Sequence, residues 1–368
     1  MVAAGKFFES SFGWTYLHGV LLVAAITLVY TLFGGFLGAT LTDVAQGLLM
    51  FAALVAVPIV AVFKVGSPGE IADGARAVNP DVFNLFAGSD GAALLALSIF
   101  STAAWGLGYF GQPHIIVRFM ALRTPADAHY GRIVSTTWMI ITALGAITTA
   151  LIGVAYFNGD DAAKAIEDPE TVFLLLSQIF FHPLVAGFVL AAVLAAIMST
   201  MSSQLVVCSS ALVEDLVNIA GRKASDKALL VYGRVGVLVV ALVGLVLALD
   251  PDSAILELVA FAWAGFGAAF GPIVLLSLYW RRLTASGAIA GMVTGAVVAI
   301  GWGMSPLGDS LYEMVPGFFL ALLVAVVITK LTKEPQPEVV AEFEEATKLA
   351  KLVENDSSLD FEEAAEKV

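Results

Sequence analysis

The stretch WGLGYFGQPH, residues 105–114, places three glycines and a proline inside an apolar segment long enough to cross a bilayer. Glycine costs a helix about 1 kcal/mol relative to alanine and interior proline about 3, and no water in hydrocarbon replaces the lost backbone donor. In secondary transporters such breaks present carbonyls and half-helix ends to substrates and ions. Trp105 and Tyr109, four residues apart, face the same side wherever the segment stays helical. The pattern indicates a binding site; the alternative is a packing kink in which small residues let helices approach.

Hydroxyl side chains crowd a second apolar segment, LAAIMSTMSSQLVVCSSALVED, residues 194–215. Hydroxyl and carbonyl oxygens are neutral, hard ligands that suit a weakly held monovalent cation. Serine and threonine in membrane helices also bond the carbonyl one turn earlier, or join neighbouring helices. The segment by itself leaves both interpretations open. Its polar residues are Ser199, Thr200, Ser202, Ser203, Gln204, Ser209 and Ser210.

Three further features lie in apolar surroundings. Asp43, in TLTDVAQG, is an intramembrane carboxylate and therefore a candidate for an ion pathway, although near the cytoplasmic interface it could also reach water. The glycine-rich stretch WAGFGAAFGP, residues 263–272, predicts close helix packing, with a flexing gate helix as the alternative. The stretch YTLFGGFLGA, residues 30–39, predicts a tight turn between two helices.

The elements that must position these residues are apolar helices. The chain of 368 residues is 59% hydrophobic and only 13% charged, with a mean hydropathy of +0.91, which leaves too few charges for the surface of a soluble protein. We predict an all-α polytopic membrane protein with about nine transmembrane helices. The expected spans are 15–33, 40–64, 91–117, 131–157, 183–210, 229–249, 254–280, 285–304 and 312–332, with longer loops at 65–90 and 158–182 and a short surface helix at 171–180.

Lys and Arg alternate with acidic residues from one loop to the next, which predicts the orientation. The basic loops carry Arg118, Arg123, Arg132, Arg222, Lys223, Lys227, Arg281, Arg282, Lys330 and Lys333; the opposite loops carry Asp160, Asp161, Glu167, Asp168, Glu170, Asp250, Asp252, Asp309 and Glu313. The C-terminus is therefore expected in the cytoplasm. We expect an external N-terminal segment (1–14), a transmembrane region (15–333) and an acidic cytoplasmic tail (334–368), which holds eleven of the 31 acidic residues.

Several classes of protein are disfavoured by what the sequence lacks. It has no Walker loop, no nucleophile with a matched base and no HExxH motif, so a primary pump or an intramembrane hydrolase has no support. The four histidines are scattered, and the single Cys208 cannot form an internal disulfide. The acidic balance argues against nucleic-acid binding. We expect no catalytic residues.

Five stretches resemble the sodium–solute symporter family, and the first of them resembles its proline branch. They are AWGLGYFGQPHIIVRFMA, LAAIMSTMSSQLVVCSSALVEDL, AFAWAGFGAAFGPIVLLSLYWRR, GFLGATLTDVAQGLLM and LYEMVPGFF, and the resemblance extends from Ala4 to Lys333. It implies a five-plus-five inverted-repeat transporter fold with additional helices. It also implies a secondary active transporter of the cell membrane that takes up L-proline by alternating access, with Na⁺ as the coupling ion.

The resemblance also implies roles for individual residues. Trp105, Tyr109 and Pro113 match the proline site on the second broken helix of the family. Sodium ligands are matched by the Ala196 carbonyl and by the hydroxyls of Ser199 and Thr200. Asp43 matches an aspartate on the ion pathway.

The chain also departs from the family pattern. The family has thirteen spans, and this sequence aligns from the external loop before the fifth, so about four N-terminal helices are expected to be lacking. Three alternatives to a complete proline symporter follow: a truncated fragment that does not transport, half of a split symporter with a companion N-terminal fragment, and a sodium symporter for another small organic solute. A membrane sensor is disfavoured because the tail is too short for a signalling domain.

Overall fold

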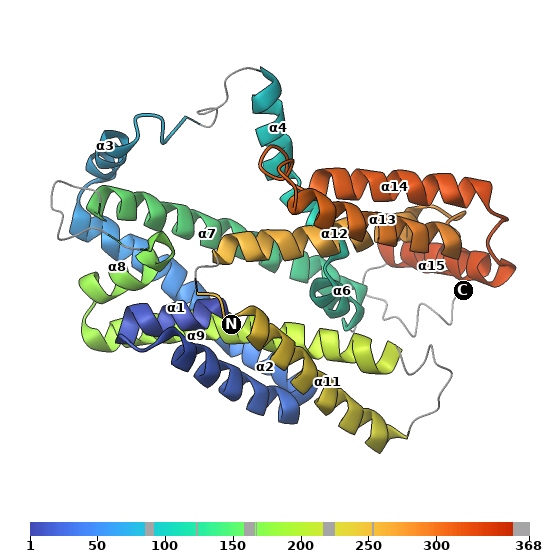
Figure 1. The fold of residues 1–368 in the computed structure, drawn as a ribbon, viewed down its shortest axis with the longest axis horizontal. Coiled ribbons are helices and arrows are strands. Elements are labelled where there is room, and N and C mark those ends of the chain that lie inside the picture. Colours follow the sequence, from blue (N-terminus) through green and yellow to red (C-terminus); the bar gives the residue numbers. More distant parts are fainter. Residues whose placement is uncertain are drawn as a thin grey trace. The chain divides into compact units, whose positions relative to one another are not determined.

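A computed structural model of the chain describes residues 1–84, 92–122, 124–157, 166, 168–215, 225–251 and 254–355. All regular elements within these ranges are helical: α1 (Val2–Phe12), α2 (Tyr16–Val65), α3 (Pro68–Val78), α4 (Ala92–Ala103), α5 (Trp105–Gly108), η1 (Tyr109–Gly111), α6 (Pro113–Met120), α7 (Pro125–Phe157), η3 (Pro169–Thr171), α8 (Val172–Phe180), α9 (Pro183–Ser210), η4 (Ala211–Asp215), α11 (Asp226–Leu247), α12 (Ile255–Tyr279), α13 (Ala285–Gly303), α14 (Met314–Leu331) and α15 (Pro337–Asn355) (Figure 1). Several residues used above to predict orientation lie outside this part of the chain: Arg123, Asp160, Asp161, Glu167, Arg222, Lys223, Asp252 and the end of the tail, 356–368.

Eight candidate membrane spans occur among the described residues, one fewer than the sequence predicts. The difference arises because the first two predicted spans belong to the 50-residue helix α2. At about 1.5 Å per residue, 50 residues reach roughly 75 Å, more than twice the thickness of a hydrocarbon core. The helical geometry is broken at Gly35, whose φ of 55° and ψ of −151° favour glycine. The predicted turn at 30–39 is thus a sharp bend at one residue.

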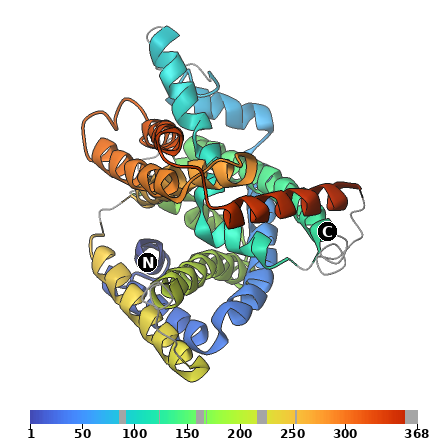
Figure 2. The ribbon, with the colours of Figure 1, turned by 90° about the vertical axis from the view of Figure 1, so that its right-hand side faces the viewer.

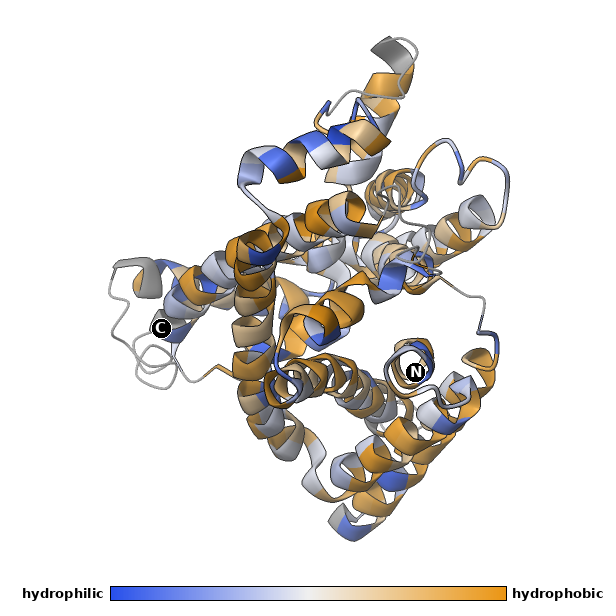
Figure 3. Cartoon of the chain, turned by 90° about the vertical axis from the view of Figure 1, so that its left-hand side faces the viewer, coloured by the Kyte–Doolittle hydropathy of each residue, from blue (hydrophilic) through white to orange (hydrophobic). Residues whose placement is uncertain are grey.

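The outer surfaces of the long helices are apolar. Figure 3 shows hydrophobic residues along most of their length, and side chains such as Phe33, Phe63 and Met120 are more than three-quarters exposed. A surface of this kind is stable in contact with lipid chains and not with water. The protein is therefore a multi-pass membrane protein.

Three helices were not predicted. Helix α3 lies in the predicted loop 65–90 and starts with a capping box, in which the Ser67 hydroxyl accepts from the Glu70 amide at 3.3 Å and the Glu70 carboxylate accepts from the Ser67 amide at 2.7 Å. Residues 1–14, which the sequence predicts to be external, contain α1, and the acidic tail contains α15. Hydropathy did not indicate these helices because none is a long apolar run. The Ser67-Pro-Gly-Glu70 stretch, in contrast, has the sequence pattern of a helix start.

The first of two compact units comprises Met1–Leu85 and Thr136–Ile255. In it α2 packs along α9 and α11, and α1 packs on α2 and α9 (Figure 2). A core of buried apolar residues joins α1, α2, α8 and α9: Ala4, Phe7, Phe8, Val23, Ala24, Leu174 and Met201. Lys6 forms ion pairs with Glu170 at 2.7 Å and Asp168 at 3.2 Å. The hydrogen bond to Glu170 raises the pKa of the Lys6 ammonium, which therefore stays charged and ties α1 to the segment that precedes α8.

The second unit comprises Phe86–Ser135 and Leu256–Val368. Helices α13 and α14 run side by side (Figure 1). Their close contact depends on glycines of α13, since a Cβ at Gly291 would lie 2.8 Å from the Ala325 side chain. The core consists of Ala104, Ala264, Ala268, Ala299, Met314 and Phe318.

Candidate functional site

The helix that contains residues 105–114 is broken, as the sequence predicts. Helix α4 ends at Ala103, a short α5 and the 3₁₀ turn η1 follow, and Gln112 is extended with φ −84° and ψ 110°. Pro113 then occupies the first turn of α6, where its missing N–H costs nothing and its fixed φ suits the helix. A proline also disfavours helical geometry in the residue before it, which explains why the break falls at Gln112.

Two glycines of the break pack directly on α12. A Cβ at Gly108 would overlap the indole of Trp263, and a Cβ at Gly111 would lie 2.6 Å from the Phe266 carbonyl oxygen and 2.7 Å from the Gly271 nitrogen. The predicted packing role of residues 263–272 is therefore confirmed. The glycines of the break also serve packing, so the packing kink and the binding site are not exclusive interpretations.

This contact gives a direct test of the break. We expect Gly111→Ala to lower the stability of the protein by about 1–3 kcal/mol, because the added methyl meets backbone that cannot move aside. Gly106→Ala is the matched control: it lies in the same segment, and a Cβ there meets nothing within 4 Å. The midpoint of thermal unfolding in detergent measures both. Equal midpoints for the two variants would contradict the packing.

An aromatic cluster surrounds Trp105. Its ring is nearly parallel to that of Trp263, with centroids 6.0 Å apart at 26°, and to that of Tyr312, 5.8 Å apart at 13°. Tyr109 meets Trp263 edge to face at 4.9 Å and 82°. Trp105 and Tyr109 thus touch the same indole, as expected for residues one turn apart. Tyr109 is 41% exposed, so the cluster has an accessible aromatic edge.

Hydrogen bonds hold the broken segment in place. The Trp263 indole N–H donates to the Trp105 carbonyl at 3.0 Å, and the buried Gln112 amide donates to the Trp263 carbonyl at 3.0 Å. Tyr312 is fixed in turn, because its hydroxyl donates to the Ala260 carbonyl at 2.7 Å. Such bonds satisfy backbone carbonyls that hydrocarbon cannot. Sequence reasoning did not assign Trp263 and Tyr312 to the site, although both lie in stretches that carried the family resemblance.

The candidate sodium ligands lie together on α9 in the first unit. The hydroxyls of Ser199 and Thr200 both donate to the Ala196 carbonyl, at 3.0 and 3.1 Å. This is the local bonding that the sequence offered as the alternative to ion binding. It also gathers three neutral oxygens at one point, and each hydroxyl can rotate to turn a lone pair toward a cation. Thr200 is exposed and Ser199 is half-buried.

Asp43 lies beside the same hydroxyl-rich stretch. Ser203, one turn after Ser199, donates to the Asp43 carboxylate at 3.2 Å. The Tyr30 hydroxyl donates to the Met198 carbonyl at 2.8 Å and fixes the backbone just before Ser199. Asp43 is half-buried, so its carboxylate is held by protein and is not simply directed to water.

The structure therefore places the predicted residues in two groups. Trp105, Tyr109 and Pro113 belong to one unit, where the first two share a cluster and Pro113 opens α6. The sodium candidates belong to the other unit, together with Asp43.

Comparisons with known proteins agree with this architecture. Residues 1–295 match the Sodium:solute symporter family. The high-affinity proline transporter PutP of Bacillus subtilis (strain 168) is 49% identical over 93% of this chain and 71% of its own length. The osmoregulated proline transporter OpuE of the same organism is 49% identical over 91% and 67%, and a Staphylococcus aureus sodium/proline symporter is 47% identical over 91% and 66%. The chain thus spans about two-thirds of each relative.

A solved structure shares the fold. It is the substrate-bound outward-open state of a Na⁺-coupled sialic acid symporter, with a TM-score of 0.70 over 91% of this chain and 71% of that one. Its sequence identity is 17%, so the likeness concerns the fold alone.

Proposed function

Because the chain belongs to the sodium:solute symporter family, we propose that it takes up L-proline across the cell membrane together with Na⁺. It is a secondary transporter and not an enzyme. The observation that carries the choice of substrate is the aromatic cluster at the helix break, taken together with relatives named as proline transporters.

The proline site is formed on Trp105, Tyr109 and Pro113. Proline combines a small apolar ring with a secondary ammonium group and a carboxylate. Aromatic faces suit the ring by apolar contact and the ammonium by cation–π attraction. Trp263 and Tyr312 act as positioning residues, because they hold Trp105 through ring contacts.

The sodium ion is bound by the Ala196 carbonyl and the Ser199 and Thr200 hydroxyls, and Asp43 lies on its pathway. Neutral oxygens bind a monovalent cation weakly enough for release on the other side. Ion and substrate are coupled by linkage: if sodium raises the affinity for proline, proline raises the affinity for sodium by the same factor. Each charge that crosses 100 mV contributes about 2.3 kcal/mol to uptake.

Uptake of radiolabelled proline tests this function. Cells that lack their own proline transporters and express the chain should accumulate proline in sodium buffer and not in choline buffer. Excess unlabelled solutes identify the substrate: proline should compete, whereas sugars should not. Sodium-dependent uptake of a different solute would support the alternative of a symporter with another substrate, and no uptake would support the non-transporting fragment.

The same assay tests whether the chain needs a companion N-terminal fragment. Cells that co-express the first third of the B. subtilis relative are compared with cells that express the chain alone. Uptake only in the co-expressing cells would establish a split symporter. Equal uptake in both would contradict the companion.

The cytoplasmic location of the C-terminus has its own test. In a Cys208→Ser background, we expect a cysteine introduced at Glu334 to react with a membrane-impermeant maleimide only after the cells are opened. A cysteine at the exposed Asp309, on the opposite side by the charge pattern, should react in intact cells. The reverse labelling would invert the topology.

A further inference from the structure

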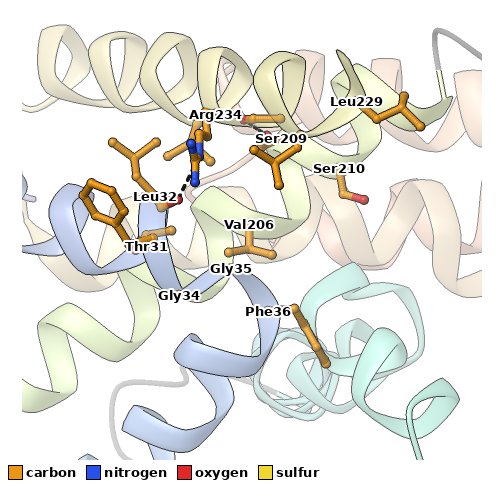
Figure 4. A pocket seen from close by; sticks show the side chains of 14 residues that line it. Thr31, Leu32, Gly34, Gly35, Phe36, Val206, Ser209, Ser210, Leu229 and Arg234 are labelled. Carbon is orange, nitrogen blue, oxygen red and sulfur yellow. Dashed lines mark hydrogen bonds between the residues drawn. The ribbon is translucent and has the colours of Figure 1, made fainter. Parts of the chain in front are cut away.

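A pocket of about 600 Å³ opens in the first unit, and none of the candidate sodium ligands lines it. It lies between the bend of α2, the end of α9 and the first half of α11 (Figure 4). Three glycines line it, Gly34, Gly35 and Gly233, and a Cβ at any of them would meet nothing within 4 Å. The pocket is open because these glycines place no side chains in it. Its volume lies within the range of small-molecule sites.

One cation faces this pocket. The Arg234 Nε donates to the Leu32 carbonyl at 3.3 Å, just before the bend, and its guanidinium lies 5.8 Å from the centre of the Phe33 ring (Figure 4). Among the described residues Arg234 forms no ion pair. The side chain is therefore anchored at Nε, and its two terminal nitrogens can donate two parallel hydrogen bonds to a phosphate. A charged residue within a membrane-spanning helix is a candidate functional residue, and Arg234 presents its charge to the pocket.

The remaining walls divide into polar and apolar parts. The Ser210 hydroxyl lies at the pocket on α9. Phe33, Phe36 and Leu230 supply large apolar surfaces that are 79%, 41% and 55% exposed. A cation beside exposed apolar walls matches a molecule with an anionic head and a hydrocarbon chain.

The position along α11 fits the membrane interface. Arg234 follows the start of the helix at Asp226 by eight residues, roughly 12 Å, and long Arg side chains reach toward the interface. Lys227, seven residues earlier, lies on the same face of α11 and adds a second positive charge. This end of α11 is the one predicted to be cytoplasmic, where basic pockets between membrane helices bind anionic head groups.

We propose that this pocket binds one anionic phospholipid, with its phosphate on Arg234 and an acyl chain along Phe33, Phe36 and Leu230. A lipid with net negative charge is favoured over a zwitterionic one because Arg234 lines the pocket and Lys227 adds a second positive charge on the same face of α11. This site is independent of the proposed transport activity, so either proposal can fail without the other.

Native mass spectrometry of the purified full chain tests the site. The probes are dioleoyl phosphatidylglycerol, dioleoyl phosphatidylcholine and glycerol phosphate. Wild type should retain one phosphatidylglycerol in preference to phosphatidylcholine, and glycerol phosphate, which lacks chains, should not displace it. Arg234→Gln should reduce phosphatidylglycerol retention about fivefold, the effect of one basic residue near a lipid surface. Arg234→Lys should keep part of it.

Two further variants separate charge from shape. Gly233→Leu places a side chain in the pocket without a change in charge and should also reduce retention. Lys330→Gln removes a basic residue outside the pocket and should change nothing. Retention that is equal for the two lipids, or unchanged in Arg234→Gln, would overturn the proposal. Displacement of the lipid by glycerol phosphate would show that the site binds free phosphate. If Arg234→Gln dissociated a dimer and no lipid were bound to wild type, the pocket would be an interface between two copies of the chain.

Discussion

Replacement of Trp105 by alanine is expected to raise the KM for proline uptake about 30-fold, equivalent to about 2 kcal/mol of binding energy. Trp105 is in contact with both Trp263 and Tyr312, so its removal takes away a surface for the pyrrolidine ring and also releases two rings that define the cluster. Trp105→Phe keeps an aromatic face and should retain much of the affinity. Initial rates over a range of proline concentrations measure the effect.

Tyr279→Ala is the matched control for Trp105. Tyr279 is also an aromatic residue of the second unit, but it is 82% exposed at the end of α12, outside the cluster. Its removal should leave the KM within about twofold of wild type. If Trp105→Ala and Tyr279→Ala had the same KM, the cluster would not be the proline site. The amount of each variant in the membrane, measured by immunoblot, separates lost binding from lost protein.

Replacement of Thr200 by alanine is expected to raise the half-saturating sodium concentration by about tenfold, the cost of losing one ligand worth roughly 1.4 kcal/mol. Thr200→Ser keeps the hydroxyl and should stay close to wild type. Sodium titration of proline uptake at a fixed proline concentration gives the value. By linkage, proline at saturating concentration should tighten sodium binding by the same factor by which sodium tightens proline binding.

Thr148→Ala separates ion binding from local helix bonding. The Thr148 hydroxyl donates to the Leu144 carbonyl at 2.7 Å, the same one-turn bond that Thr200 makes to Ala196. If Thr200 served the helix alone, both alanine variants would behave alike. A tenfold shift for Thr200→Ala with no shift for Thr148→Ala is the result that supports sodium ligation.

The helix break shows which features of the site the local sequence can predict. Glycines and a proline within 105–114 disfavour a continuous helix in hydrocarbon, so the break could be predicted, and the structure places it at Gln112. The residues that contact the broken segment could not be predicted in this way. Trp263 lies 158 residues from Trp105, and no periodicity in either segment indicates that an indole N–H would donate to the Trp105 carbonyl.

The hydroxyl-rich segment shows a different limit. Spacings of three and four residues indicate that Ser199 and Thr200 can both bond to Ala196, and they do. The same spacing fits ion ligation, so pattern alone could not choose between them. Helices α1, α3 and α15 were not predicted for another reason: their apolar signals are weak, and hydropathy detects only long apolar runs.

By itself, the sequence determined the class of the protein and the position of nearly every span, and it predicted two stretches as binding sites. These follow from local requirements, since a bilayer demands long apolar helices and tolerates a break only where protein or cavity surrounds it. Only the tertiary structure decided that Trp263 and Tyr312 complete the aromatic cluster, that Ser203 bonds to Asp43 and that Arg234 faces a glycine-lined pocket. Each of these joins residues from distant segments, and the packing of whole helices, which no local pattern encodes, brings them together.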